Sequence, residues 1–310
     1  MDTVRVALDW TPNTIHSGLF LAKHKGYYKA EGLEVNLVSP SADEYALTPA
    51  KKLALGQADV AIAPSESVIS YFIHSEYEKL VAIAAILQQD VSAIVTLSVS
   101  GIDSPAQLDN KVYASYNARY EGLILKEMIR NAGGKGEVKE ITPPKLGIWD
   151  TLITGEADAT WVFMPWEGLK AERRGVSLHP FRMDDYQVPY GYSPVLLASY
   201  SALSRDKEKL SRFIRATAKG YIEAASNPEE AVDSLQQLSN HPSLQDRDFL
   251  LESQRRISSY YLNEKGRFGI MEEQRWERFI DFLFEKGMLE EQAYATMKKE
   301  TLYTNELLEG

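Results

Sequence analysis

The residues best suited to chemistry lie where a strand-like run gives way to a helical pattern. The stretch LDWTPNTIH (8–16) places an indole (Trp10), an amide (Asn13) and an imidazole (His16) at one strand-to-helix corner. The indole offers a flat face for stacking, and the amide both donates and accepts hydrogen bonds. His16 is better placed to orient the loop than to catalyse. The corner therefore suits one face of a planar ligand.

Aromatic and acidic residues recur at the ends of other predicted strands. These further candidates for ligand contact are Ser65, Glu66, Tyr116, Arg119, Glu121, Phe163, Trp166, Glu167 and Tyr190. A carboxylate can accept a hydrogen bond from an exocyclic amine or pair with a protonated ring nitrogen. The set predicts a site for a small, nitrogen-bearing aromatic ring, and Arg119 favours an anionic group on it if the guanidinium faces the ligand.

Each candidate also has a structural interpretation. Trp10 can be a core residue at the end of a buried strand, and Glu66, Glu121 and Glu167 can be acids in the first turns of helices, where the helix dipole favours them. The shared position at strand ends, rather than any single residue, supports the prediction of a site.

Composition excludes several classes of function. The formal charge of −10 disfavours nucleic acid, and the basic pairs are Arg173-Arg174 and Arg255-Arg256, which we interpret as solvated helix faces. Cysteine is absent, which excludes disulfides, thiolate metal sites and a cysteine nucleophile. The five histidines lack the spacing of a metal site. We expect no nucleic acid partner and no metal.

No stretch is long and apolar enough to predict a membrane span. The chain enters an alternating strand at its start, without a basic and apolar leader. Two expectations stay open: a periplasmic or cell-surface protein if a signal peptide was removed, and a cytoplasmic one if Met1 is native.

Strand and helix patterns alternate along the first part of the chain. The expected order is strand 4–10, helix 17–29, strand 33–38, helix about 46–55, strand 58–63, helix 65–74 and strand 80–88. This rhythm predicts an α/β fold with largely parallel sheets. Ser104-Pro105 and Asn227-Pro228 are expected to open later helices, with Glu230 in the position of a capping box.

An internal echo predicts two similar lobes. LALGQADVAIAPSE (53–66) recurs in outline as LITGEADATWVFMPWE (152–167), each with a glycine suited to a left-handed helix cap and Ala-Asp leading into a strand. Two passages without a helix, near residues 90 and 194, predict crossings between the lobes. We expect lobe 1 to comprise 1–90 plus 195–310, lobe 2 to comprise 91–194, and a ligand cleft to lie between them.

These stretches resemble a known family. LDWTPNTIHSGLFLAKHKGYYKAEGLEV, YASYNARYEGLILKEMIRNAGG and TWVFMPWEGLKAERRG, with shorter pieces in the same order, are similar to the SsuA/THI5-like group of periplasmic-binding-protein relatives. The group joins thiamin pyrimidine-precursor binding proteins and hydroxymethylpyrimidine phosphate synthases. The resemblance covers almost the whole chain, and its most specific motif is W-x-P-N-x-x-H.

The resemblance implies a type II periplasmic-binding-protein fold, two α/β lobes that close on a small ligand. It implies that Trp10, Asn13, Glu66, Tyr116, Glu121 and Glu167 contact a pyrimidine. The expected function is a solute-binding protein for hydroxymethylpyrimidine or formylaminopyrimidine, without a cofactor, serving an ABC permease or thiamin biosynthesis.

The alternative is a cytoplasmic enzyme resembling the synthases and dependent on pyridoxal phosphate. The lysine that holds that cofactor and the histidine four residues later correspond here to Ala63 and Ser67, and the cysteine-rich motif is missing. Because neither residue can do that chemistry, the enzyme is disfavoured. Use of Lys51 or Lys52 with His74 stays open, as does another flat ligand such as a flavin or an aromatic acid.

Overall fold

The computed structural model describes residues 1–74, 76–144 and 147–309, and these divide into two compact units. Unit 1 comprises Met1–Asp90 and Gly191–Gly310, and unit 2 comprises Val91–Tyr190. The first boundary lies at the residue predicted from the sequence, and the second lies four residues before the predicted one.

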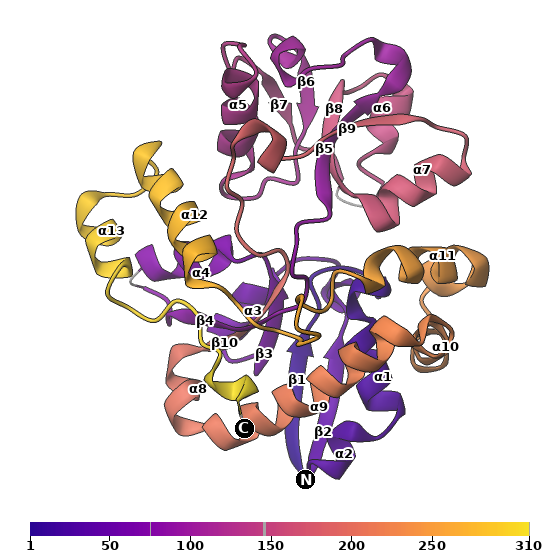
Figure 1. Cartoon of the computed structure of the whole chain (residues 1–310), viewed down its shortest axis with the longest axis vertical. Coiled ribbons are helices and arrows are strands. Elements are labelled where there is room, and N and C mark those ends of the chain that lie inside the picture. The colour runs from indigo at the N-terminus through magenta and orange to yellow at the C-terminus, as the bar shows by residue number, and fades with distance from the viewer. Residues whose placement is uncertain (75, 145–146, 310) are drawn as a thin grey trace. The chain divides into compact units, whose positions relative to one another are not determined.

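Unit 1 contains a mixed sheet with the strand order β2-β1-β3-β10-β4 (Figure 1). Its strands are β1 (Asp2–Ala7), β2 (Leu33–Val38), β3 (Val60–Ala63), β4 (Leu80–Ala85) and β10 (Val195–Ser199). β1 pairs in parallel with β2 and β3, whereas β10 runs antiparallel to both of its neighbours. Residues of β3 and β4 are buried throughout, as expected for strands covered on both faces.

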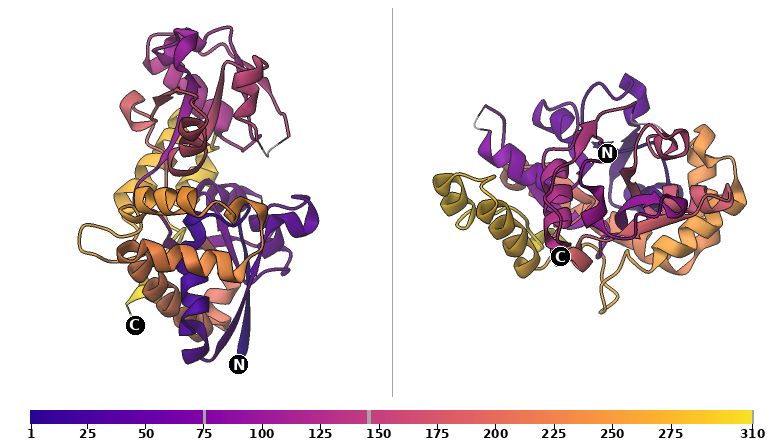
Figure 2. Two further views of the ribbon diagram at one scale, coloured as in Figure 1. Left: turned by 90° about the vertical axis from the view of Figure 1, so that its right-hand side faces the viewer. Right: turned by 90° about the horizontal axis from the view of Figure 1, so that it is seen from above.

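Helices of unit 1 come from both ends of the chain. They are α1 (Ser17–His24), α2 (Tyr27–Ala30), α3 (Pro49–Ala54), α4 (Glu66–Ile73), α8 (Tyr200–Arg205), α9 (Lys207–Ser226), α10 (Pro228–Leu238), α11 (Arg247–Ser258), α12 (Glu273–Glu285) and α13 (Glu291–Met297). Short 3₁₀ turns are η1 (Thr14–His16), η2 (Pro40–Asp43), η7 (Pro242–Leu244) and η8 (Glu306–Leu308). Both chain ends lie at the same end of this unit (Figures 1 and 2).

Close packing of α1 on α9 depends on glycine. A Cβ added at Gly220 of α9 would lie 2.0 Å from the carbonyl oxygen of Gly18 in α1. Only a residue without a side chain allows the two backbones this approach. α1, which follows the corner at Trp10, is thereby packed closely against α9, which is distant from it in sequence.

Unit 2 repeats this architecture. Its sheet has the order β7-β6-β8-β5-β9, from β5 (Ser92–Leu97), β6 (Val112–Ala114), β7 (Lys139–Ile141), β8 (Ala159–Phe163) and β9 (Leu178–Phe181). Its helices are α5 (Glu121–Asn131), α6 (Asp150–Thr154) and α7 (Leu169–Arg173), with a π-helix at Met164–Gly168 and 3₁₀ turns at Ser98–Ser100, Pro105–Leu108 and Asp184–Tyr186. β6 pairs in parallel with β7 and β8, and β5 runs antiparallel to β8 and β9.

The internal echo of the sequence is therefore a repeated structure. Gly56 and Gly155 both have left-handed backbones, with φ of 69° and 75°. After each glycine an aspartate ties its strand to the neighbouring parallel strand: Asp59 accepts a hydrogen bond from the backbone N–H of Arg5 at 2.8 Å, and Asp158 from that of Val112 at 2.8 Å. The prediction of two similar α/β units is confirmed.

Most predicted elements are present, but several details were wrong. The strand expected over 4–10 is Asp2–Ala7, the strand expected over 80–88 ends at Ala85, and Ser104-Pro105 opens a 3₁₀ turn. The helix expected over 17–29 is divided into α1 and α2, because Gly26 takes a left-handed φ of 73°. Asn227 makes no side-chain cap at α10, and Glu230 pairs with Lys25, the residue that follows α1, instead of closing a capping box.

One side chain joins the segments of unit 1 from which the chain leaves and to which it returns. Arg275 of α12 donates to the carbonyl oxygens of Gln88, at 2.6 Å, and Gly191, at 2.8 Å. Its guanidinium also lies 4.1 Å from the centroid of the Tyr192 ring. Planar, multidentate donation of this kind is specific to arginine.

Candidate functional site

In unit 1 the corner after β1 is built around Asn13. Its side-chain oxygen accepts from the backbone N–H of Ile15 at 2.8 Å, which caps η1, and its Nδ2 donates to the carbonyl of Thr11 at 2.9 Å. Asn13 is buried. The structure thus shows a capping role for the predicted ligand residue, and a contact between its remaining amide hydrogen and a ligand stays a prediction.

His16 is fully buried and orients the same corner. Its Nδ1 accepts from the backbone N–H of Asn13 at 3.2 Å, and its Nε2 lies 2.7 Å from Oδ1 of Asp9. The first bond leaves the proton on Nε2, which donates to the carboxylate. Both ring nitrogens are engaged within the protein, so the structure supports the orienting role expected from the sequence rather than a direct ligand contact.

Helices from the far end of the sequence hold this turn in place. Tyr221 of α9 donates to the carbonyl of Ile15 at 2.8 Å, and Tyr261 donates to that of Thr14. The Thr14 hydroxyl also lies 2.8 Å from that of Ser253 in α11. Because these groups are buried, the hydrogen bonds fix the corner with little freedom, as a recognition site requires.

Trp10 lies at the exposed side of this corner, half-buried, with its ring centroid 5.5 Å from that of Tyr45 and the planes tilted by 60°. Tyr45 belongs to the loop after η2 and was not among the residues predicted from the sequence. The Trp10 ring is accessible enough to stack on a ligand and is supported by a second aromatic ring.

The end of β3 brings Ser65 and Glu66 to the start of α4, both buried. The backbone N–H of Ser65 donates to the carbonyl of Tyr192 at 2.8 Å. In the described part of the chain the Ser65 hydroxyl has no hydrogen-bond partner. A buried hydroxyl without a hydrogen-bond partner lowers the stability of the fold, unless a ligand or a water molecule forms a hydrogen bond with it.

In unit 2, Glu121 organises the loop that follows β6. Its Oε1 accepts from the Tyr113 hydroxyl at 2.7 Å and the Tyr116 N–H at 3.1 Å, and its Oε2 accepts from the Ser115 hydroxyl at 2.9 Å and the Ala118 N–H at 3.1 Å. Four donors match the accepting capacity of a carboxylate. The structure therefore shows a structural role for Glu121, and its predicted ligand contact would have to displace one of these donors.

The residues Met164–Gly168 (MPWEG) form a π-helix between β8 and α7. Wider turns of this kind are rare and occur often at functional sites. The half-buried Glu167 accepts from the N–H of Phe163 at 3.1 Å. Burial raises the pKa of Glu167, although the Lys170 charge and the Phe163 N–H oppose the shift. A carboxylate held in this way gains from any ligand that donates a hydrogen bond to it.

Tyr116 and Tyr190 are further candidates in unit 2, and they have different neighbours. The hydroxyl of Tyr116 has its pKa raised by burial and then by the charges of Glu167 and Glu121, which places Tyr116 within electrostatic reach of both acids. Tyr190 packs edge to face on Trp161 at 5.4 Å. That Tyr116, Glu167 and Tyr190 contact a ligand stays a prediction.

Trp166 and Arg119 stack with neighbours in the chain. Lys170 lies 4.9 Å from the centroid of the buried Trp166 ring, and burial lowers the pKa of this lysine. Arg119 is exposed, with its guanidinium 5.7 Å from the Tyr120 ring. Whether Arg119 meets an anionic ligand stays a prediction.

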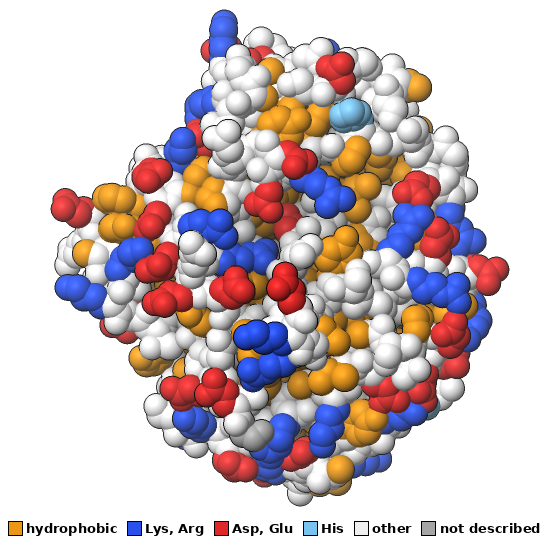
Figure 3. Space-filling model, viewed as in Figure 1, with side chains coloured by type: hydrophobic (Ala, Val, Ile, Leu, Met, Phe, Trp, Pro, Cys, Tyr) orange, Lys and Arg blue, Asp and Glu red, His pale blue; other side chains and the backbone are white. Residues whose placement is uncertain are grey.

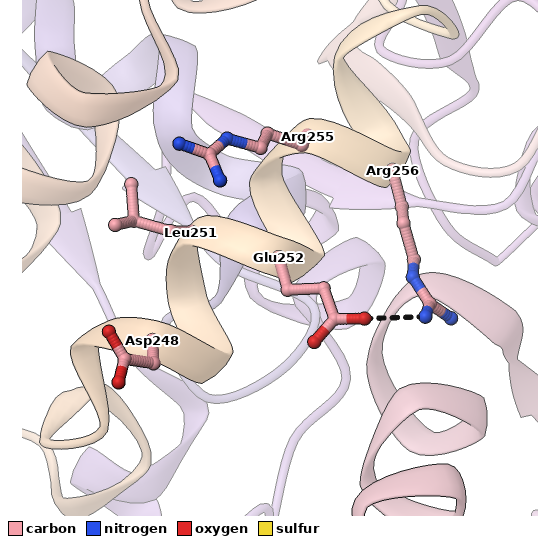
Figure 4. Close-up of a pocket in the computed structure, with 5 residues that line it drawn as sticks. All are labelled: Asp248, Leu251, Glu252, Arg255 and Arg256. Carbon is pink, nitrogen blue, oxygen red and sulfur yellow. Dashed lines mark hydrogen bonds and ion pairs between the residues drawn. The ribbon is translucent and has the colours of Figure 1, made fainter.

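Charged side chains of both signs lie close together on the surface. Acidic and basic side chains are intermingled over the face shown in Figure 3. A shallow depression on α11 is lined by Asp248, Leu251, Glu252, Arg255 and Arg256 (Figure 4). Arg256 pairs with Glu252 at 2.6 Å and Arg255 with Glu229 at 2.7 Å. Such ion pairs fit the solvated helix face expected for this arginine pair.

Within residues 1–74, 76–144 and 147–309, no cluster of three or more histidine, aspartate or glutamate side chains could hold a metal ion. In the same described part, none of the helices has the length and hydrophobicity needed to cross a membrane.

The family described as NMT1/THI5 like matches residues 13–231, which span both units. The chain belongs to this family. The chain is 29% identical to the formylaminopyrimidine-binding protein of Halalkalibacterium halodurans over 306 residues, covering 95% of this chain and 88% of that protein. The resemblance seen in the sequence motifs is thereby confirmed.

A solved structure with the same fold is the alkanesulfonate-binding protein SsuA from Xanthomonas axonopodis pv. citri bound to MOPS, with a TM-score of 0.69, 13% identity, and coverage of 96% of this chain and 97% of that one. The type II periplasmic-binding-protein fold is confirmed. The 4-amino-5-hydroxymethyl-2-methylpyrimidine phosphate synthase THI13 of Saccharomyces cerevisiae is 23% identical, but the match covers only 51% of this chain and 45% of that protein.

Both lysines considered for the enzyme alternative are engaged in the structure. Lys52 is buried and pairs with Asp43 at 2.9 Å, and the Lys51 ammonium lies 3.4 Å from the centroid of the Tyr77 ring. A Schiff-base lysine must instead present a free amine to its cofactor. The structure therefore gives the enzyme alternative no support.

Proposed function

We propose that the chain is a solute-binding protein for a small aromatic nitrogen heterocycle, a thiamin pyrimidine precursor such as hydroxymethylpyrimidine or formylaminopyrimidine. The observation that carries the proposal is the near full-length similarity to a formylaminopyrimidine-binding protein. The site residues agree with it, because aromatic and acidic side chains lie at corresponding strand ends of two sheets with the same order.

In this proposal Trp10 stacks on the ring and Glu167 accepts a hydrogen bond from its edge. The half-buried indole offers a face, and the carboxylate, whose pKa burial raises, is stabilised by an N–H donor. Ser65 supplies a buried hydroxyl that is unpartnered in the described chain. Uptake through an ABC permease, from the periplasm or the cell surface, is the use that such a protein would serve.

The test is a calorimetric titration with hydroxymethylpyrimidine, run beside pyridoxal phosphate. We expect saturable binding of the pyrimidine, and a loss of about 1–3 kcal/mol of binding free energy in Trp10→Ala, the usual scale for removing a stacking aromatic. Tyr200→Ala is the matched control, because Tyr200 is an exposed aromatic residue of the same unit.

Binding of pyridoxal phosphate alone would contradict the proposal and favour the enzyme. Unchanged pyrimidine affinity in Trp10→Ala would contradict the stacking role only.

A further inference from the structure

The chain leaves unit 1 after Asp90 and returns to it at Gly191. The two segments lie side by side within unit 1, because the backbone N–H of Ile86 donates to the carbonyl oxygen of Pro194 at 3.0 Å. Nearer to the points of departure and return, at Gln88 and Gly191, a side chain joins the same two segments.

Arg275 of α12 makes this connection. One terminal nitrogen of its guanidinium donates to the carbonyl oxygen of Gln88 at 2.6 Å, and the other donates to that of Gly191 at 2.8 Å. Both donors belong to one rigid plane, so the two carbonyl groups are held in a fixed relative position. The guanidinium also lies over the ring of Tyr192, whose hydroxyl accepts from the backbone N–H of Glu272 at 2.9 Å. We call Arg275 with these two carbonyl groups the arginine clamp.

The helix that carries the clamp is itself held firmly in unit 1. The buried Trp276 ring stacks on Tyr303, with the centroids 5.5 Å apart and the planes 6° from parallel. Tyr303 forms a bridge with Ala82 of β4. Before the helix, the backbone of Met271 exchanges two hydrogen bonds with the side chain of Asn305, at 3.0 and 2.8 Å. The C-terminal segment therefore fixes α12 to the sheet, and the clamp has a rigid support.

The same two segments are anchored again where they enter unit 2. The carbonyl oxygen of Val91 accepts from the backbone N–H of Met164 at 3.0 Å. Tyr190 packs edge to face on Trp161 of β8, with the centroids 5.4 Å apart. Between the anchors of the two units lie only residues 89–90 on one segment and the link from Tyr190 to Gly191 on the other.

We propose that Arg275 is a positioning residue that sets the unit-1 boundary of the hinge, so that the two units turn about residues 89–90 and the link from Tyr190 to Gly191. Arg275 acts through the two carbonyl groups rather than through a ligand. A short hinge allows the ligand-free protein few open arrangements, so a larger fraction of molecules is ready to close on a ligand. This inference goes beyond the proposed function, because it concerns the hinge and not the identity of the ligand.

The experiment measures distances between the units in the ligand-free protein. Because the chain has no cysteine, Gln57→Cys in unit 1 and Lys135→Cys in unit 2, both at exposed positions, place two spin labels for pulsed electron paramagnetic resonance. We expect a broader distribution of distances in Arg275→Met than in the labelled protein with Arg275. Calorimetry should show an affinity for hydroxymethylpyrimidine that is about 3- to 10-fold weaker, since losing one or two hydrogen bonds shifts a conformational equilibrium by such a factor.

The matched control is Arg278→Met, the same substitution at an exposed position of the same helix, which should change neither the distances nor the affinity. Arg275→Lys is the second variant, because it keeps the charge but cannot present a planar pair of donors. We expect it to give an intermediate broadening. Hydrogen exchange adds a local readout, since the amide of Gln88 should exchange faster in both Arg275 variants while the amides of β1 do not change. Melting temperatures and far-UV circular dichroism check that each variant folds.

The outcomes separate this inference from the proposed function. Unchanged distances in folded Arg275→Met or Arg275→Lys overturn the inference, and if Arg275→Met does not fold, Arg275→Lys decides it. Equal broadening in Arg278→Met also overturns it, because the effect would then arise from the charge of α12. Broader distances without a loss of affinity overturn it too, because the additional open arrangements would then not compete with closure. A wild type that binds no pyrimidine overturns the proposed function, and the ligand-free distances still decide this inference.

Discussion

Replacing Glu121 by glutamine tests whether this residue organises its loop or serves the ligand. The carboxylate is 2% exposed and accepts from two hydroxyl groups and two backbone N–H groups. Glutamine keeps the shape but turns one accepting oxygen into a donor.

The loss of stability depends on which of the four donors to Glu121 can change its hydrogen bond. The hydroxyls of Tyr113 and Ser115 can rotate and accept from the new N–H₂ group, whereas the backbone N–H groups of Tyr116 and Ala118 cannot. One backbone donor therefore loses its partner in either orientation of the amide, at about 1–3 kcal/mol. The remaining bonds also lose their charge-assisted strength, roughly half of their value. We expect Glu121→Gln to lower the free energy of unfolding by about 2–4 kcal/mol.

Urea unfolding followed by tryptophan fluorescence and circular dichroism measures this loss. Trp149, Trp161 and Trp166 report on unit 2, in which Glu121 lies. Hydrogen exchange gives the local readout, since the amides of Tyr116 and Ala118 should exchange faster in the variant.

The matched control is Glu140→Gln in the same unit. Glu140 is exposed and pairs with Lys126 at 2.8 Å, so its loss should change stability by less than about 0.5 kcal/mol. If Glu121→Gln is as stable as this control yet loses ligand binding, the structural reasoning is refuted and Glu121 belongs to the ligand.

Two further variants probe the site. Burial raises the pKa of Glu167, so the native state holds that proton more tightly than the unfolded state and stability falls as pH rises above the ordinary carboxyl range of about 4. Glu167→Gln should thus be more stable than the wild type at pH 7, equal to it below about pH 4, and weaker in binding; a pH series of urea midpoints showing no difference at pH 7 contradicts this. A Cβ at Gly191 would lie 2.2 Å from the Ser65 hydroxyl, so Gly191→Ala should cost about 1–3 kcal/mol, and adding Ser65→Ala should recover most of it. Equal costs in both backgrounds, measured by thermal unfolding, would show that the clash is relieved elsewhere.

Much of the fold could be predicted because its signals are local and repeated. The strand at 33–38 was predicted to the residue, since alternation and turn residues mark it on both sides. The internal echo predicted two related units. The same connection from helix to strand needs the same two residues, a glycine with a left-handed backbone and an aspartate that bonds to the neighbouring strand. Tertiary contacts set the details that were wrong: Glu230 pairs with Lys25, a residue distant in sequence.

The site was predicted less well, because residue type does not reveal which hydrogen bonds are already made within the protein. His16 and Glu121 have the chemistry of ligand residues, yet the structure engages their polar atoms internally. Asp9 shares the position of Trp10 at the end of the first strand, a signal that could have identified it. Tyr45 could not be identified in this way, because its contact with Trp10 depends on a left-handed backbone conformation that the sequence does not reveal.

The order of strands in unit 1 has a consequence for synthesis on the ribosome. β10 lies between β3 and β4, so this sheet cannot be completed until residue 199 has been made, and Arg275 is added later still. Unit 2 is continuous and ends at Tyr190. Domains fold as their chain emerges from the ribosome. Unit 2 can therefore form its sheet before β10 has been synthesised, at a time when β3 and β4 of unit 1 still lack the strand that lies between them.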